Sequence, residues 1–421
     1  GLYQLQAGEY LLWRKGSDAL SRESYYDFFA TAFRDEGQEA LIHELDQATD
    51  AIFSRLMEDA AGRPVFVPLS GGLDSRLVLC KLKQLGYDNL RSFSYGPPGN
   101  YEAKGGKWVA EKLDVPWTFL PTLRKNASRF FHSNARTGYW EYGWHLATLP
   151  FIQDIQTLWE ENDSATFPRD AVFVNGNSGD FITGGHIPKL CAGPGPFSGR
   201  DLVDAILHKH FALWPELLHQ EGMGRIRANI LEQARVPGPE ATLSPQELAA
   251  HHELWEWRER QCKYVVNGQR SYDFMGYAWF LPLWDDEWFH FWQDIPLALK
   301  LRQNLYKTYL ETFNWYGVFR EFPVTIWRWP GAAISIVPLA RAVGLVSRKA
   351  QAKLYHWFSY WGHYRHLNAQ FGRTTFHTHQ SRIRGFNSLL AARVLCEQNL
   401  LHLVPELPCP GVAGEKTVPC H

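Results

Sequence analysis

Apolar residues recur along this chain in two alternating patterns. From about Glu39 to Ala61 they follow one helical stripe, which consists of Leu41, Leu45, Ala48, Ile52, Phe53 and Leu56. After this stripe, short apolar runs typical of buried strands alternate with helical segments. The predicted strands are 65–69, 91–95, 117–120 and 171–175, and the predicted helices are 76–86, 101–114 and one near 141–160. This alternation predicts an α/β fold in which right-handed crossovers build a parallel sheet with flanking helices.

The two ends of the chain do not follow this alternation. Residues 1–30 are short strand-like pieces between turn residues, whereas 201–322 are mostly helical and aromatic-rich. We therefore expect three parts in a chain of 421 residues, which is too long for one ordinary core. They are 1–36, the remnant of a preceding N-terminal domain with its linker; 37–322, the main domain; and 323–421, an aromatic and basic C-terminal extension.

Charge is unevenly distributed along the chain. The formal net charge of −1 argues against general nucleic-acid binding. The C-terminal extension nevertheless carries eleven Lys and Arg against three Glu, a net charge of +8. Helical spacing near 347–367 would separate aromatic rings from cations, which suits an interfacial helix beside anionic lipid. We favour a helix packed on the main domain with a solvated basic face, and peripheral membrane contact through this region is the alternative.

The cysteines and apolar runs indicate a cytoplasmic location. The six cysteines lack any Cys-x-x-Cys spacing, so they are predicted to be free thiols in a reducing compartment. The longest apolar stretch, Gly331–Val346, is too short to cross a bilayer and contains Pro338 and Arg341. The start of the sequence does not resemble a signal peptide.

A glycine-containing loop follows the first predicted strand. It reads Ser70-Gly71-Gly72-Leu73-Asp74-Ser75 and leads into a helix. Backbone N–H groups without glycine side chains can close around an oxyanion at a helix N-terminus, where the helix dipole also favours negative charge. The loop lacks the Gly-Lys-Ser/Thr ending of a Walker motif. A tight turn would explain the Gly-Gly pair alone, but the added hydroxyls and acid favour a phosphate loop.

A second loop follows the strand at 171–175. Residues 175–185 contain Asn177, Asp180 and the pair Gly184-Gly185. In parallel sheets ligands bind at the carboxyl ends of the strands, where both loops lie. An ordinary polar loop is the alternative for this segment.

Together the two loops resemble the synthetase domain of glutamine-dependent asparagine synthetases and their relatives, the β-lactam synthetases. The first loop resembles the pyrophosphate loop of the ATP-pyrophosphatase superfamily, and 176–185 follow a G-x-x-x-D-x-x-x-G-G pattern. The likeness covers about 38–312, and residues 1–30 resemble the tail of the family's glutaminase domain. Further matching segments are Tyr101-Glu102, Val109–Leu113, Pro282–Asp285, Ile295-Pro296 and Leu305–Leu310.

The resemblance implies an adenine nucleotide α-hydrolase-like fold and an ATP site. It places Ser70, Gly71, Gly72 and Ser75 on the pyrophosphate, and Leu69, Ser94 and Gly176 on the nucleotide through backbone atoms. It assigns Asp74 and Asp180 to Mg²⁺, and Lys307 to charge on the α-phosphate and the adenylated intermediate. A helix N-cap role for Asp74 and a solvated helix charge for Lys307 are the structural alternatives.

Two departures from the family pattern concern the acceptor. Asn177 replaces the family's glutamate, which takes a proton from attacking ammonia, so Asn177 is an acceptor-side candidate that cannot act as a base. The family's Glu-x-Arg segment is replaced by Ala278–Leu281. The resemblance implies an ATP-dependent amidotransferase that adenylates a carboxylate. The two departures argue against aspartate as this acceptor, and a uronic acid in surface-polysaccharide synthesis is one example of another.

The remaining expectations concern nitrogen and the competing functions. The family's catalytic N-terminal Cys is not in this sequence, so ammonia is expected from a glutaminase domain outside it. One alternative is amide formation by an internal amine, as in β-lactam synthetases. Another is a catalytically inactive nucleotide-binding homologue.

Overall fold

A computed structural model describes most of the chain. It covers residues 4–321 except 17–18, 145–147, 150, 153, 163, 165 and 212–221, together with 336–347, 350–351, 354, 390–391 and 394–395. The chain divides into two compact units. The first holds the described parts of 1–121, 139–209 and 221–322, and the second those of 122–138, 210–220 and 323–421.

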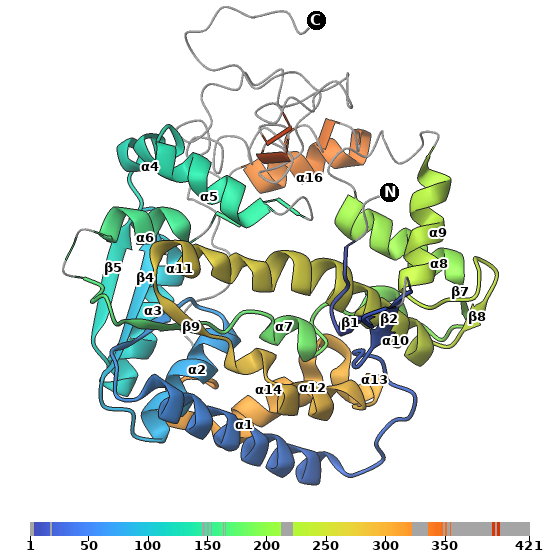
Figure 1. The fold of residues 1–421 in the computed structure, drawn as a ribbon, viewed down its shortest axis with the longest axis horizontal. Coiled ribbons are helices and arrows are strands. Elements are labelled where there is room, and N and C mark those ends of the chain that lie inside the picture. Colours follow the sequence, from blue (N-terminus) through green and yellow to red (C-terminus); the bar gives the residue numbers. More distant parts are fainter. Residues whose placement is uncertain are drawn as a thin grey trace, which may run out of the picture. The chain divides into compact units, whose positions relative to one another are not determined.

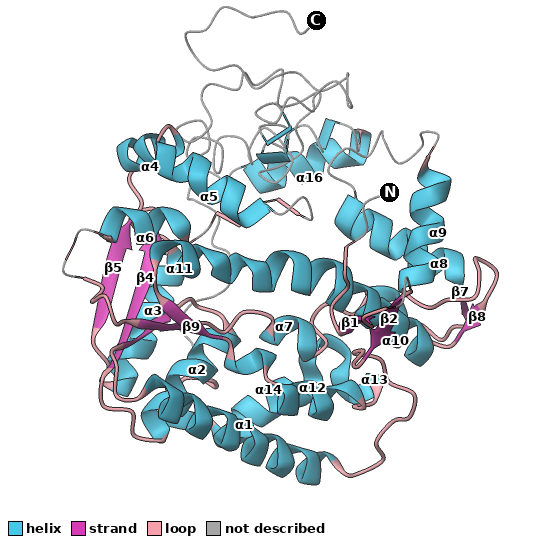
Figure 2. Cartoon of the chain, in the orientation of Figure 1, coloured by secondary structure: helices cyan, strands magenta, loops and turns pink. Residues whose placement is uncertain are grey.

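The first unit contains a five-stranded parallel sheet, whose strands are magenta on the left of Figure 2. Its order is β5-β4-β3-β6-β9, with β3 at Val65–Pro68, β4 at Leu90–Gly96, β5 at Trp117–Pro121, β6 at Val172–Val174 and β9 at Ala278–Phe280. The predicted α/β class is thus confirmed. The chain builds outward from β3 through β4 to β5 and then places β6 on the other side of β3. This switch brings the loops after β3 and β6 together.

Side chains alternate between the two faces of the sheet. Val65 and Val67 of β3 join the larger core, whereas Phe66 joins a second, aromatic-rich core with Phe173 of β6. Helices that contribute buried residues to the larger core include α1 (Gln38–Ala60), α2 (Leu73–Gln84), α3 (Tyr101–Leu113), α12 (Asp286–Gln293) and α14 (Asn304–Phe313). Helices α6 (Ile155–Glu161) and α11 (Arg270–Met275) contribute to the second core.

Two predicted helices differ from the observed ones. Helix α2 begins at Leu73 instead of Arg76, so that Asp74 lies in its first turn. The single helix predicted near 141–160 is wrong, because α5 (Asn134–Trp144) ends early in that range and α6 begins only at Ile155. Pro150 falls between them in the sequence, and a proline cannot donate the backbone hydrogen bond of a helix interior.

The region 222–321 is mostly helical, as predicted, although β9 was missed because three residues give little pattern. Its helices include α9 (Met223–Gln233), α10 (Pro245–Glu256) and α13 (Leu297–Lys300), with a π-helical segment, η4 (Trp257–Val265), continuing directly from α10 (Figure 1). The shorter elements before it are α7 (Gly179–Ile182), β7 (Phe197–Ser198) and α8 (Gly199–Ile206), and β8 (Thr242–Leu243) pairs with β7.

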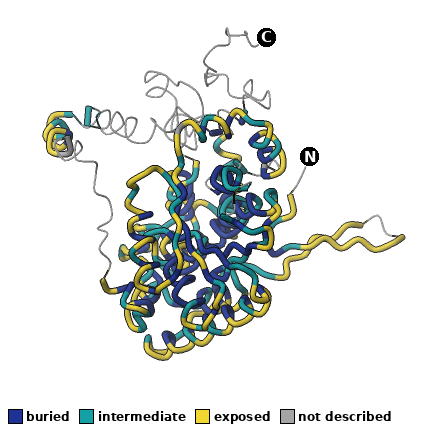
Figure 3. Tube along the Cα trace, turned by 90° about the vertical axis from the view of Figure 1, so that its left-hand side faces the viewer, coloured by how far each residue is buried: buried dark blue, intermediate teal, exposed yellow. Residues whose placement is uncertain are grey.

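Near the N-terminus, β1 (Glu9–Trp13) and β2 (Leu20–Ser24) form an antiparallel hairpin. Every residue of β2 is exposed, and the hairpin extends away from the buried core of its unit (Figure 3).

In the second unit, the described helices include α4 (Arg124–Phe131) and α16 (Ile336–Val346). The predicted interfacial helix near 347–367 lies almost entirely outside the described residues. Among the described helices, none combines the length and apolar composition needed to cross a bilayer.

Candidate active site

The loop after β3 is held by its own hydroxyl groups. The N–H of Ser70 donates to Oγ of Ser75 at 3.1 Å, and the N–H of Gly72 donates to Oγ of Ser70 at 3.1 Å. The two hydroxyl oxygens lie 3.1 Å apart. From the helix, Nε of Arg76 donates to the carbonyl of Gly72 at 3.1 Å. These hydrogen bonds within the hexapeptide hold the loop closed, with the hydroxyl groups of Ser70 and Ser75 next to each other.

The N-terminus of α2 has no side-chain cap. Its N-cap residue is Gly72, which has no side chain to accept a hydrogen bond from the first-turn N–H groups. The first N–H groups of a helix have no partner within it, so an uncapped N-terminus can bind an anion. The alternative that Asp74 is the N-cap residue does not hold, because Asp74 lies in the first turn.

Two glycines bring the loop after β6 against Asp74. A Cβ on Gly176 would lie 2.8 Å from the backbone N of Ser75, and one on Gly179 would lie 2.6 Å from Cγ of Asp74. Any side chain at either position would therefore collide with the first loop. Between them, Ser178 has a left-handed backbone with φ of 70°, a conformation that costs about 1–3 kcal/mol and is common at functional sites.

Asp74 and Asp180 meet at this junction. The buried hydroxyl of Tyr306 donates to Oδ1 of Asp74 at 2.8 Å, and the backbone N–H of Asp180 donates to the same carboxylate. Burial and then the negative charge of Asp180 raise the pKa of Asp74 to about 7, although these two hydrogen bonds lower it. The site thus gathers two acids whose charges repel each other.

His186 faces the second acid. Its Nε2 lies 2.9 Å from Oδ2 of Asp180, and its Nδ1 pairs with Glu256. Burial lowers the pKa of His186, but the hydrogen bonds to Asp180 and Glu256 outweigh this effect. The net result is a pKa raised to about 9. Burial also raises the pKa of Asp180, yet the hydrogen bond and charge of His186 bring it below its usual value. Asp180 is therefore ionised at neutral pH beside a cationic imidazole.

The other predicted nucleotide contacts occupy the neighbouring strand ends. Leu69 is buried directly after β3, and its carbonyl accepts a 2.6 Å hydrogen bond from the hydroxyl of Ser94 on β4. That hydroxyl also accepts a hydrogen bond from Nε1 of Trp117 at 3.0 Å. The side chain of Ser94 therefore links β4 to β5 and to the residue after β3. Asn177 is half-buried on the second loop, next to Gly176.

Lys307 lies one residue after Tyr306 on α14. Its side chain is exposed and its ammonium donates to the carbonyl of Arg302 at 2.8 Å. The structure brings together Asp74, Asp180 and the serine loop by direct contacts, whereas Lys307 is linked to them through its neighbour Tyr306. Its proposed charge-neutralising role therefore stays a prediction.

Three residues of the site were not predicted from the sequence. Tyr306 stands inside the matching segment 305–310, beside Lys307, and His186 directly follows the Gly184-Gly185 pair. Adjacency to these motifs was the available signal for both. Glu256 is 70 residues beyond His186, and no spacing in the sequence indicates their contact.

A parallel sheet with a glycine-serine phosphate loop and two facing acids at its switch point defines a nucleotide-binding α/β domain. Residues 44–313 match the family model for asparagine synthase. The match covers more than half of the chain, which therefore belongs to the asparagine synthase family. Membership supports ATP use and ATP-dependent amide formation as its general activity. A search of curated proteins found no match to this chain.

Proposed function

We propose that this protein adenylates a carboxylate acceptor with ATP, releases pyrophosphate, and transfers ammonia to the acyl-adenylate to form an amide and AMP. The observation that supports this most directly is the meeting of Asp74 and Asp180 at the carboxyl ends of β3 and β6. This acid pair adjoins an uncapped helix N-terminus and a loop of serine hydroxyls. A site for a polyphosphate needs these components in one place.

The acid pair fits a hard divalent cation. Two carboxylates offer the oxygen ligands that Mg²⁺ prefers, and the side chain of Asp180 is 54% exposed, so an ion can reach it. Burial and then the charge of Asp180 raise the pKa of Asp74, and a bound cation would favour the ionised form of this carboxylate. Bound there, Mg²⁺ would supply charge neutralisation of the phosphates.

The residues of the chain supply binding and electrostatics in this mechanism. The loop N–H groups with Ser70 and Ser75 bind the leaving pyrophosphate. Lys307 stabilises the negative charge that develops at the α-phosphate, a contribution that is worth about 10²–10³ in rate for comparable groups. The proton released when ammonia attacks cannot go to Asn177, so the acceptor side differs from an aspartate-specific site.

The acceptor is proposed to be bulkier than aspartate, with a uronic acid as one example. Support comes from Asn177 and from Ala278–Leu281, which occupy the two positions where the family carries an acid and a Glu-x-Arg segment. Residues 278–280 form the edge strand β9, paired with β6, which places this replaced segment directly beside the second loop.

ATP–pyrophosphate exchange with a panel of carboxylates tests the proposal. The panel holds aspartate, free and nucleotide-linked uronic acids, and amino-substituted acids, each with and without ammonium. We expect exchange with one non-aspartate acid and formation of its amide on addition of ammonium. Efficient exchange with aspartate would contradict the changed acceptor, and absence of Mg·ATP binding would contradict the activity itself.

Ammonium, and not glutamine, is the proposed nitrogen source for these 421 residues, because the family's N-terminal Cys nucleophile is not among them. Product formation in glutamine alone, with ammonia removed enzymatically, would contradict this. Amide formation without any added nitrogen source would instead favour an internal amine.

An inactive nucleotide-binding homologue is the second candidate, and Asn177 is the observation that favours it. Binding of Mg·ATP without exchange on any acid would support this candidate. Location in the cytoplasm and peripheral contact with anionic lipid remain proposals from the cysteine and charge patterns. Sedimentation with anionic vesicles at low and high salt tests the lipid contact, since electrostatic docking weakens with salt.

A further inference from the structure

His186 is held between two carboxylates from different parts of the fold. It follows the Gly184-Gly185 pair, and its two ring nitrogens face Asp180 and Glu256. A neutral imidazole has one N–H donor, whereas both of these partners are acceptors. The imidazolium form satisfies both, so His186 acts as a fixed cation that joins the second loop to α10.

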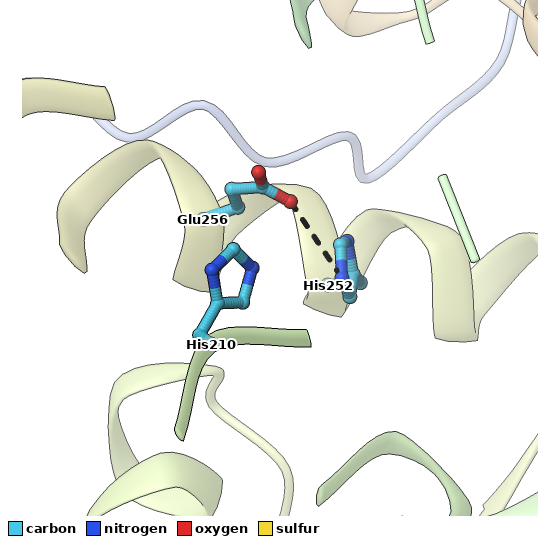
Figure 4. A group of neighbouring side chains, drawn as sticks. All are labelled: His210, His252 and Glu256. Atoms are coloured by element: carbon cyan, nitrogen blue, oxygen red, sulfur yellow. Dashed lines mark ion pairs between the residues drawn. The ribbon is translucent and has the colours of Figure 1, made fainter. Parts of the chain in front are cut away.

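Glu256 anchors this contact from the interior. Its side chain is fully buried at the end of α10, and an ionised carboxylate there requires compensating partners. Nζ of Lys209 donates to its two oxygens at 3.0 and 2.9 Å. Figure 4 shows His252 one turn earlier on α10, with its Nε2 3.7 Å from Oε2 of Glu256. The contacts with Lys209 and His252 thus hold the carboxylate of Glu256 in place beside His186.

The π-helical segment after α10 supplies a second tie to the same loop. Oε1 of the buried Gln261 accepts a 3.1 Å hydrogen bond from the hydroxyl of Ser178. π-Helical turns are rare in proteins, and many of those that occur lie at functional sites. Here η4 places Gln261 on the loop directly before Asp180, at the residue with the left-handed backbone. Glu256 of α10 and Gln261 of η4 therefore contact the second loop on either side of Asp180, at His186 and at Ser178.

We propose that His186, supported by Glu256, is a positioning residue that fixes the carboxylate of Asp180 toward Asp74 and the divalent cation that the two acids share. This inference rests on the proposed function, because it assigns the cation to these acids. Side chains that hydrogen-bond to a metal-binding group restrict its orientation, and losing such a partner weakens metal binding about 10–100-fold. Without His186, the carboxylate of Asp180 would keep only the 2.8 Å hydrogen bond that the backbone N–H of Phe181 donates to Oδ1, so its orientation would be less restricted.

Binding of Mn²⁺ in the presence of ATP, measured by electron paramagnetic resonance, tests the proposal without requiring turnover. We expect His186→Gln to weaken Mn²⁺ binding about 10–100-fold in a protein that still folds, because Lys209 stays paired with Glu256. The matched control is His251→Gln on α10, the helix that carries Glu256. The Nδ1 atom of His251 lies 2.7 Å from the carbonyl oxygen of Ala234, away from the site. The control should bind Mn²⁺ like the unmodified protein.

A double-mutant cycle with Glu256→Gln separates positioning from general support of the fold. If Glu256 acts through His186, the double variant should bind Mn²⁺ no more weakly than His186→Gln alone. If the losses of Mn²⁺ affinity in the two single variants add in the double variant, Glu256 does not act through His186. Unchanged Mn²⁺ affinity in His186→Gln would overturn the proposal. If Glu256→Gln does not fold, the single variant His186→Gln still decides. Failure of the unmodified chain to bind Mn²⁺ with ATP would instead overturn the proposed function.

Discussion

The loop after β3 and the loop after β6 meet at Asp74, yet they are held in different ways. The first is closed by hydrogen bonds among Ser70, Gly72 and Ser75, all within six residues. The second is held from outside, by Gln261 on Ser178 and by the pair of His186 with Glu256. The phosphate half of the site is therefore a local structure, whereas the acid that completes it depends on distant helices.

The largest effect should come from removing either acid. Asp74→Asn and Asp180→Asn should each reduce ATP–pyrophosphate exchange to near background while the fold persists, because both charges are needed to hold the cation against the phosphates. Exchange with the acid found active in the panel measures this. Asp88→Asn, at an exposed aspartate, is the control. Full activity in either acid variant would remove that residue from the site.

Lys307 should have the next largest effect. Lys307→Ala should reduce exchange about 10²–10³-fold by removing charge stabilisation. The stability change should stay within about 0.5 kcal/mol, since the side chain is exposed. Lys83→Ala is a close match, because Lys83 also donates to a backbone carbonyl, that of Asp114, at 3.2 Å. Equal exchange rates in the two variants would show that Lys307 is an ordinary surface charge.

The contact between the loops predicts a stability difference between two glycines. Gly179→Ala should destabilise the fold by about 1–3 kcal/mol, because its Cβ would lie 2.6 Å from both Cγ of Asp74 and Cδ1 of Leu283. Gly224→Ala in α9 should stabilise by about 0.5–1 kcal/mol, since nothing lies within 4 Å of its Cβ. Urea unfolding measures both. An unchanged free energy of unfolding in Gly179→Ala would mean that the two loops can separate.

The smallest effect is expected at Asn177. Restoring the family's acid with Asn177→Glu should not produce efficient aspartate amidation, because the Glu-x-Arg segment is also replaced at 278–281. Product analysis with aspartate and ammonium checks this. An active asparagine synthetase after this one change would show that the acceptor side differs at a single residue.

Much of the fold could be predicted from the pattern of the sequence, because its signals are local. The period of apolar residues indicated α1 and four of the five strands, and the Gly-Gly hydroxyl motif indicated the phosphate loop. Strand β9 was missed because three residues have no period, and the break between α5 and α6 was missed although Pro150 marked it.

What the sequence determined by itself is the class of fold, the two strand-end loops and the chemistry of the acids on them. Only the tertiary structure decided which groups surround those acids. The hydroxyl of Tyr306 reaches Asp74 across 232 positions, and Glu256 reaches His186 across 70. Such contacts depend on strand order and on where α10, η4 and α14 pack. Hydrogen bonds and burial act through space, so no spacing along the chain encodes them.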